Sequence, residues 1–465
     1  MRFGVIGTPD CLARFHRWSA RIRGPIPSPD PGKAHMFGWP GFEAAFRCQW
    51  PDRPIAELTV DAEKLSKTIR IEDRTEAIYK AVDLFEQPIL EYRAREEAQP
   101  AFWFVAIPEE VYLLGRPQSS VPKGERERGT APVGKHWIRR SARSGQTLLL
   151  PEDRQFAEMQ RYAKNFHNQL KARLLREKIA VQVVRDTTLT PEDFKKSNGR
   201  PLRGTQDAPT IAWNLCTTAF FKGEGKPWKL ASVRDGVCYI GLVFKLDPTD
   251  AGRPNACCGA QMFLDSGDGV VFRGAMGPWW STDRRECHLS REAAEDLVRI
   301  VIDEYKKRHG APPRELFIHG KAAFNNAEWA GFSAAMPETT KLVGVRIRHS
   351  TDLKLFRPGA LPIMRGLAYR ASDTRAYLWS TGYVPRLDTY PGWETPNPIL
   401  IEIVRGEAKI ETVLADILGL TKLNYNACEY GASMPVTLNF ADAVGEILMA
   451  APSENTPPLP FRYYI

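Results

Sequence analysis

The sequence predicts an α/β fold in two parts. Short runs of apolar and β-branched residues alternate with segments whose apolar residues recur every three or four positions, as strands and amphipathic helices do. A stretch rich in glycine and charged residues, 223–228, separates the two parts. Several strand-like runs follow it before strands and helices alternate again.

Length and composition describe an ordinary globular protein. The chain has 465 residues, 43% of them hydrophobic and 26% charged, enough for about two to four domains. No apolar run approaches the ~20 residues of a membrane span, and the first seven residues resemble a buried strand more than a signal peptide. None of the eight cysteines forms a Cys-x-x-Cys pair or a zinc-type cluster. We therefore expect a cytoplasmic protein with reduced thiols and no membrane partner.

The first part alternates strands and helices in the order of a parallel sheet. Short strands and helical stretches occupy the first hundred residues, and strand 101–107 ends at a proline. After a basic loop, one long helix is predicted from Pro151 to Lys178, with its apolar residues on one face. Strand 179–184 and helix 211–222 follow. A Rossmann-like sheet is therefore expected.

The second part starts with three neighbouring strands. These lie near 233–246, 257–264 and 269–273, and a hairpin turn at 265–268 joins the last two. Ser290 caps a helix that Gly310 ends. Strand 315–319, helix 323–336, strands near 341–348, 363–370 and 399–405, and helices near 407–418 and 441–450 follow. This order suits an RNase H-like fold, although periodicity alone fits other α/β folds equally.

Positive charge is concentrated in one loop. The net charge of +9 permits a polyanionic partner. Between residues 123 and 143, seven basic residues stand against two acidic ones, with His136 and Trp137 among them. The loop is either a solvated surface segment or an arm that follows a phosphate backbone, with Arg139 and Arg140 as contacts.

The end of the chain resembles the end of PIWI domains. Segments 420–426 and 435–442 carry this resemblance, and strand 317–320 followed by a helix fits it as well. The junction around Asn214, 220–223 and 227–228 resembles the end of a MID domain. The chain is thus similar to a short prokaryotic Argonaute. The resemblance implies an α/β segment at 1–100 leading into a Rossmann-like MID domain at 101–230, then an RNase H-like PIWI domain at 231–465, without room for separate N and PAZ domains.

Carboxylates that this resemblance leads one to expect are missing. Nucleases of this kind hold metal ions with acidic side chains. In cutting relatives an aspartate follows the Ile-Gly-aliphatic stretch of the first strand, where this chain has Val243. An Asp-Gly pair is expected after strand 316–319, but the chain continues through Lys321. Because valine offers no ligand and an ammonium group repels cations, we expect no nuclease activity.

Four residues match a guide-phosphate pocket. His167 and Lys171 are four positions apart on the predicted long helix and so share one edge. Gln182 follows on the next strand, and Lys222 ends the next helix. Lysine supplies charge, and histidine and glutamine supply directed hydrogen bonds. MID domains hold a guide 5′-phosphate with such residues in this order, whereas the spacing alone also fits a solvated cationic edge.

Two further contacts come from the resemblance. In relatives the C-terminal carboxylate shares a Mg²⁺ ion with the guide phosphate, which assigns the carboxylate of Ile465 to such a site, with simple edge packing as the alternative. Lys422, Asn424 and Asn426 alternate, so on an extended segment they face one side. The resemblance implies contact with nucleic-acid backbone there, and a polar loop satisfying its own turn is the alternative.

The resemblance implies a guide-directed sensor. A 5′-phosphorylated guide, expected to be RNA, pairs with single-stranded target DNA of a plasmid or phage, and base pairing reads the sequence. Short Argonautes act with a separate APAZ-containing chain fused to a sirtuin-like or TIR effector, which would deplete NAD⁺ in a defence response.

Two other functions remain open. A metal-dependent nuclease with displaced ligands would use residues such as Asp247, Asp265 or Asp442, although Asp247 lies ~13 Å along the strand from the expected position. Glu286 is the nearest candidate for the family's catalytic glutamate. A Rossmann-type cofactor enzyme would use Gly4–Gly7, which lacks the full Gly-x-Gly-x-x-Gly pattern.

Overall fold

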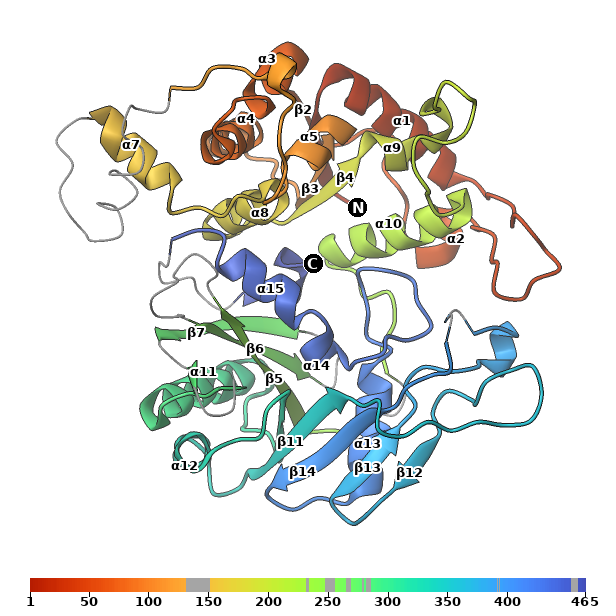
Figure 1. Ribbon diagram of the computed structural model, residues 1–465, viewed down its shortest axis with the longest axis vertical. Coiled ribbons are helices and arrows are strands. Elements are labelled where there is room, and N and C mark those ends of the chain that lie inside the picture. Colours follow the sequence, from red (N-terminus) through yellow and green to blue (C-terminus); the bar gives the residue numbers. More distant parts are fainter. Residues whose placement is uncertain are drawn as a thin grey trace.

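The computed structural model shows two lobes, each built around one main sheet (Figure 1). It describes residues 1–130, 151–230, 234–246, 256–264, 269–277, 280–281, 286–390, 392, 394–452 and 459–465. The basic arm with Arg139 and Arg140, the turn 265–268 and the candidate ligand Asp247 lie outside these ranges.

A four-stranded parallel sheet forms the upper lobe in the order β2-β1-β3-β4. Its strands are β1 (Phe3–Gly7), β2 (Ala56–Thr59), β3 (Phe102–Ile107) and β4 (Val181–Arg185). The Rossmann-like prediction is confirmed. Because β1 pairs directly with β3, the boundary suggested near residue 100 runs through one sheet.

Helices cover both faces of this sheet. Apolar residues of α1 (Pro9–Arg23) and α10 (Ala208–Lys222) form one core with the sheet. Those of α3 (Ala62–Ile69), α4 (Arg74–Arg95) and α8 (Phe166–Arg176) form the other. The shorter helices are α2 (Phe42–Phe46), α5 (Glu109–Leu114), α7 (Pro151–Met159) and α9 (Asp186–Leu189), with 3₁₀ turns η1 (Lys123–Glu125) and η2 (Pro191–Asp193).

The single long helix predicted from Pro151 to Lys178 is wrong. The chain forms α7 and α8 with a break between them. Asn165 starts α8 as its N-cap, since its side-chain oxygen accepts a hydrogen bond from the main-chain N–H of Asn168 at 3.1 Å. In the break, the N–H of Ala163 donates to Ala450 O of the lower lobe at 3.0 Å. A contact with the lower lobe is therefore made where the predicted helix would have continued.

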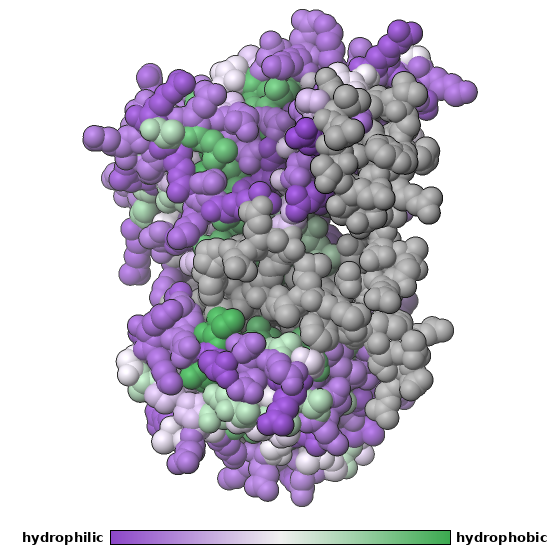
Figure 2. All heavy atoms as spheres, turned by 90° about the vertical axis from the view of Figure 1, so that its left-hand side faces the viewer, coloured by the Kyte–Doolittle hydropathy of each residue, from purple (hydrophilic) through white to green (hydrophobic). Residues whose placement is uncertain are grey.

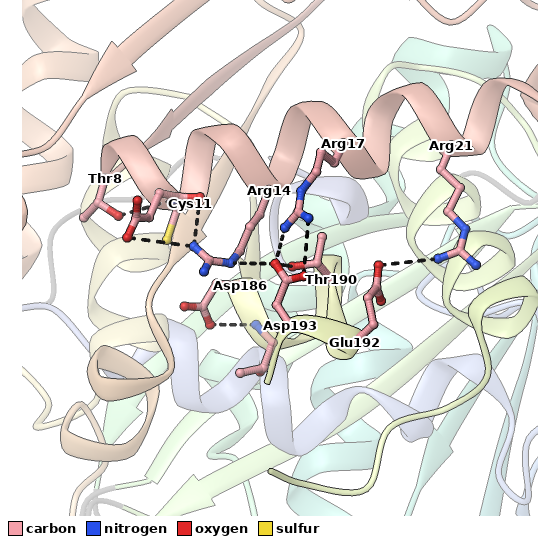
Figure 3. Close-up of polar contacts among 11 residues, drawn as sticks. Thr8, Cys11, Arg14, Arg17, Arg21, Asp186, Thr190, Glu192 and Asp193 are labelled. Carbon is pink, nitrogen blue, oxygen red and sulfur yellow. Dashed lines mark hydrogen bonds and ion pairs between the residues drawn. The ribbon is translucent and has the colours of Figure 1, made fainter. Parts of the chain in front are cut away.

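A row of arginines on α1 holds the segment that follows β4. Arg14, Arg17 and Arg21 share one face of the helix and point toward Asp193 and Glu192 (Figure 3). Arg17 pairs with Asp193, while Arg14 Nε lies 3.5 Å from its Oδ2. Ion pairs therefore connect α1 to η2 on this side of the upper lobe.

The lower lobe holds a nine-stranded sheet of mixed direction, ordered β12-β13-β14-β11-β10-β5-β6-β7-β15. Strand β5 (Val237–Leu246) lies parallel to β10 (Glu315–Gly320), which lies parallel to β11 (Lys341–His349). Strands β6 (Ala256–Leu264) and β7 (Gly269–Gly277) follow antiparallel on the other side of β5. This central order is that of an RNase H-like sheet, as predicted.

Helices also cover both faces of the lower sheet. On one face lie α11 (Arg291–His309) and α12 (Asn326–Ala334). On the other lie α13 (Ile410–Leu420), α14 (Val436–Asn439) and α15 (Ala441–Leu448). Ser290 caps α11 and Gly310 ends it in the left-handed conformation, as predicted.

The edges of this sheet differ from the prediction. A strand predicted over 363–370 is confined to β12 (Ala368–Arg370), and the sequence reading missed β13 (Arg375–Leu378), which joins it to β14 (Ile399–Arg405). At the other edge β15 (Leu459–Pro460) pairs with β7 and leads into η4 (Phe461–Tyr463). A separate pair, β8 (Trp280–Ser281) and β9 (Glu286–Cys287), completes the strands.

On the side that Figure 2 presents, hydrophilic residues cover most of the described surface and hydrophobic ones show in small patches. Among the described helices, none combines the length and apolar character that crossing a bilayer requires.

Gly241 allows α14 to approach β5 closely. A Cβ atom at this position would collide with the main-chain oxygen of Thr437, and backbone cannot yield as a flexible side chain does. We expect Gly241→Ala to lower the free energy of unfolding by about 1–3 kcal/mol. Gly124→Ala is the control, because an added Cβ there meets nothing within 4 Å. Equal denaturation midpoints for the two variants would refute this packing.

Candidate anion-binding site between the lobes

One face of α10 connects the two lobes. Asn214, Thr218 and Lys222 are four positions apart and so lie in one row along the helix. Asn214 Oδ1 accepts from the N–H of Cys428 at 2.9 Å, and the Thr218 hydroxyl donates to Asn426 O at 3.1 Å. Lys222 Nζ donates to Arg462 O at 3.0 Å and also to a main-chain oxygen of Ile465. The last residues of the chain thus end against α10.

A second lysine reaches the same segment from α8. Lys171 Nζ donates to Tyr464 O at 3.2 Å. Lys171 is 4% exposed and Lys222 is fully buried. Two ammonium groups therefore approach the final residues from two helices of the upper lobe.

Burial makes both charges unfavourable. It lowers the pKa of Lys171 from 10.5 to about 7. Burial, and then the positive charges of Lys171 and Arg462, holds the pKa of Lys222 well below its usual range. For Lys171 this corresponds to a cost of about 5 kcal/mol for the charged form. Two of the oxygens that the lysines contact, those of Tyr464 and Arg462, are neutral carbonyls, so a further anion beside the ammonium groups would be favoured.

His167 lies at the same place on α8. Its side chain is exposed, yet burial by the surrounding protein and then the charge of Lys171 lower its pKa to about 3, with a smaller contribution from Lys222. The exposure and the lowered pKa are compatible, because water reaches the His167 ring while protein surrounds it on several sides. Its Nδ1 lies 3.0 Å from Oδ1 of Asn168. The imidazole is therefore neutral and close to both lysines.

Gln182 lies on β4, which packs against both α8 and α10. Its Nε2 donates to Val183 O at 3.3 Å, while its buried Oε1 has no hydrogen-bond partner among the described residues. The structure thus brings Lys171, Lys222 and Ile465 together, sets His167 within electrostatic reach, and leaves Gln182 on the strand between the two helices.

The segment with Lys422, Asn424 and Asn426 is a turn, so the expectation that the three side chains face one side is wrong. Asn424 is 7% exposed, and its Oδ1 accepts from the N–H of Asn426 at 2.9 Å. Lys422 and Asn426 are exposed. Asn424 thus stabilises its own turn, which leaves two side chains of this segment toward solvent. The sequence reading missed the docking of this turn on α10.

The two positions at which the resemblance leads one to expect acidic ligands are Val243, within β5, and Lys321, directly after β10. Gly241 and His319, two residues before them, are partners in register. Lys321 is exposed. His319 is buried, which lowers its pKa to about 3, and its Nδ1 lies 2.9 Å from the Thr437 hydroxyl.

Other acidic candidates are distributed differently. Glu286 Oε2 lies 3.6 Å from Nε2 of His288, whose Nδ1 is 2.8 Å from Oε2 of Glu328. Asp442 lies on α15, and its side chain is outside the described part. Within the part of the chain that the structure describes, no three His, Cys, Asp or Glu side chains gather in a way that could hold a metal ion.

Comparison with known proteins gives a sequence relative. No family model matches the chain. Over 284 residues it is 21% identical to the Argonaute protein of Aquifex aeolicus, a match that covers 60% of this chain and 35% of that protein.

Solved Argonaute structures match almost the whole chain. The structure of Clostridium butyricum Argonaute bound to a guide DNA and a 19-mer target DNA has a TM-score of 0.58 at 14% identity and covers 100% of this chain and 50% of that one. The crystal structure of A. aeolicus Argonaute has a TM-score of 0.53 at 14% identity, covering 99% and 48%. This chain therefore shares the fold of Argonautes over about half the length of those structures and is similar in sequence to one of them.

Proposed function

We propose that this protein binds the 5′-phosphate of a guide strand with Lys171 and Lys222. The observation that carries the proposal is the pair of buried ammonium groups, whose charged forms are disfavoured until an anion arrives. His167 and Gln182 supply further polar groups on the neighbouring elements. A terminal phosphate carries up to two negative charges near neutral pH and so matches two cations.

A Mg²⁺ ion fits beside this phosphate. Magnesium prefers a few hard oxygen ligands from protein, supplemented by phosphate and water. Where Ile465 ends the protein, its carboxylate is such a ligand, and the unpartnered Oε1 of Gln182 is a second candidate. When bound, the ion would offset the repulsion between carboxylate and phosphate.

The wider proposal is a guide-directed sensor. A guide, by family resemblance RNA, would pair with single-stranded target DNA of a plasmid or phage. Recognition would activate a separate APAZ-containing chain with a sirtuin-like or TIR effector that consumes NAD⁺. The argument for a sensor without cleavage is that Val243 and Lys321 stand in the sequence where the resemblance leads one to expect acidic ligands. NAD⁺ that stays constant after guide and matched target are added to the co-purified complex would contradict the effector role.

Replacing the lysines tests the phosphate site directly. We expect Lys171→Met and Lys222→Met each to reduce the preference for a 5′-phosphorylated over a 5′-hydroxyl guide by about tenfold or more, since a charged hydrogen bond contributes about 1.5–3 kcal/mol. Methionine keeps the length of the side chain and removes the charge. The measurement is the ratio of the two dissociation constants, with unfolding temperature as a check on folding.

Lys307→Met is the matched control, because the side chain of Lys307 is 75% exposed on α11. It should leave the ratio unchanged. A wild-type protein that binds phosphorylated and hydroxyl guides equally would exclude the site.

Guide binding should depend on pH. Lys171 has a pKa of about 7 in the free protein, and a bound phosphate would raise it, so binding takes up a proton above pH 7. We therefore expect the affinity for a phosphorylated guide to fall as pH rises from about 7 to 9. Titrations at constant ionic strength would measure this slope. Lys171→Arg, which stays charged, should make the slope shallower, with Lys222 accounting for what remains, and identical slopes for the two proteins would contradict the assignment.

A nuclease with displaced ligands is the competing function. Incubation of the guide-loaded protein with labelled target and Mg²⁺ or Mn²⁺ separates the two proposals. We expect intact target after extended incubation. Guide-dependent cleavage that Asp442→Ala abolishes would instead establish a displaced metal centre.

A further inference from the structure

The segment that leads into β12 concentrates exposed apolar side chains. Eleven large hydrophobic residues are exposed in the part of the chain that the structure describes, and six of them lie between residues 355 and 369. Phe356, at 73% exposed, and Tyr369, at 55%, are the most accessible of the six. Exposed apolar groups gathered in this way are typical of surfaces that bind another protein. The six are Leu355, Phe356, Leu361, Met364, Leu367 and Tyr369.

Strand β12 forms one edge of the nine-stranded sheet, with β13 as its neighbour (Figure 1). Leu367 O accepts a hydrogen bond from a main-chain N–H just beyond β13, and the N–H of Ala371 donates to the first residue of β13, each at 2.9 Å. Residues of an antiparallel strand bond alternately to one side and to the other, so Ala368 and Arg370 direct their N–H and C=O groups away from β13. Such an edge is a template for a further strand.

The side chains of β12 leave its outer main-chain groups accessible. All three residues of the strand are exposed. Arg370 points toward α13, where its guanidinium donates to Glu411 at 2.8 Å. Tyr369 lies on the opposite face by alternation, with its ring centroid 6.3 Å from that of Tyr377 on β13. An added strand would therefore meet outward main-chain groups and an aromatic surface for its own apolar side chains.

The charge beside this edge indicates the kind of partner. Residues 351–371 contain four basic side chains and a single acidic one, Asp352. Within the described chain, Lys354, Arg357 and Arg365 form no ion pair, and Arg357 instead lies over the ring of Tyr383 at 5.8 Å. Two copies of this protein joined edge to edge would bring like charges together, which disfavours such a pair. An acidic segment would complement these charges.

We propose that β12 binds an extended segment of a partner protein in which apolar side chains alternate with acidic ones. The segment adds a strand to the lower sheet through the main-chain groups of Ala368 and Arg370. Its apolar side chains pack beside Tyr369, and its carboxylates offset the positive charge of residues 354–370. This interface is separate from the guide-phosphate site and does not depend on it.

Matched peptides test the chemistry of this edge. One short peptide alternates valine with glutamate, and its counterpart alternates valine with lysine. Calorimetric titration of the full chain should show the glutamate peptide binding about tenfold or more tightly than the lysine peptide, because like charges oppose the second complex.

Ala368→Pro tests the main-chain contact. Proline removes the outward N–H and leaves the bonds to β13 in place, so binding of the glutamate peptide should be lost. Ala368→Val is the matched control, since valine keeps the N–H, and it should bind as the wild type does. Arg357→Glu is an independent test that leaves β12 unchanged, and it should reduce the preference for the glutamate peptide.

Four results would overturn the proposal. The first is equal binding, or absence of binding, for the two peptides. The second is glutamate-peptide binding that Ala368→Pro leaves intact at the wild-type unfolding temperature. The third is a preference that Arg357→Glu does not reduce. The fourth is a dimer in sedimentation experiments that Ala368→Pro dissociates, which would assign the edge to a second copy of this chain.

Discussion

Two buried ammonium groups between the lobes constrain the rest of the structure. An isolated lysine charge in protein interior is costly, so Lys171 and Lys222 require oxygen atoms within reach. The oxygens come from the last residues of the chain, and Lys222 contacts Ile465 across 243 positions of sequence. The final segment, the two helices and the edge strand β4 must therefore be assembled together. Neither lobe completes this site alone.

The helices that carry the lysines have other contacts that follow from this constraint. The row Asn214, Thr218 and Lys222 on α10 meets the turn after α13 and the chain end. Helix α8 packs against α15 and contributes apolar residues to the core of the lower lobe. The interface is thus hydrophobic where the helices meet and polar where the chain ends. Such an arrangement holds the two cations in position, since lysine side chains would otherwise seek water.

Much of this fold could be predicted, because the caps and apolar periods that define its helices and strands lie within short stretches of sequence. Ser290 before α11 is a cap that the sequence displays directly, whereas the cap Asp207 was missed and α10 begins before the predicted residue 211. The break between α7 and α8 could not be predicted in the same way, because the apolar period continues through it and the deciding bond, from Ala163 to Ala450, comes from the other lobe. Asn424 shows the same limit. Its alternation with Lys422 and Asn426 suggested an extended strand, whereas its side chain closes a turn.

The candidate lysines were identifiable by order and type, but their burial was not, and the proposal of an anion site depends on that burial. The same reasoning applies to the sheet of the lower lobe. Gly241 and His319 keep β5 and β10 in register and pack against Thr437 of α14, so the framework beneath the expected metal centre depends on packing and on one neutral imidazole. None of these contacts needs a carboxylate at Val243 or Lys321. An RNase H-like sheet of this kind therefore keeps its geometry without acidic ligands at those two positions, because the forces that hold the strands are independent of the groups that would hold metal ions.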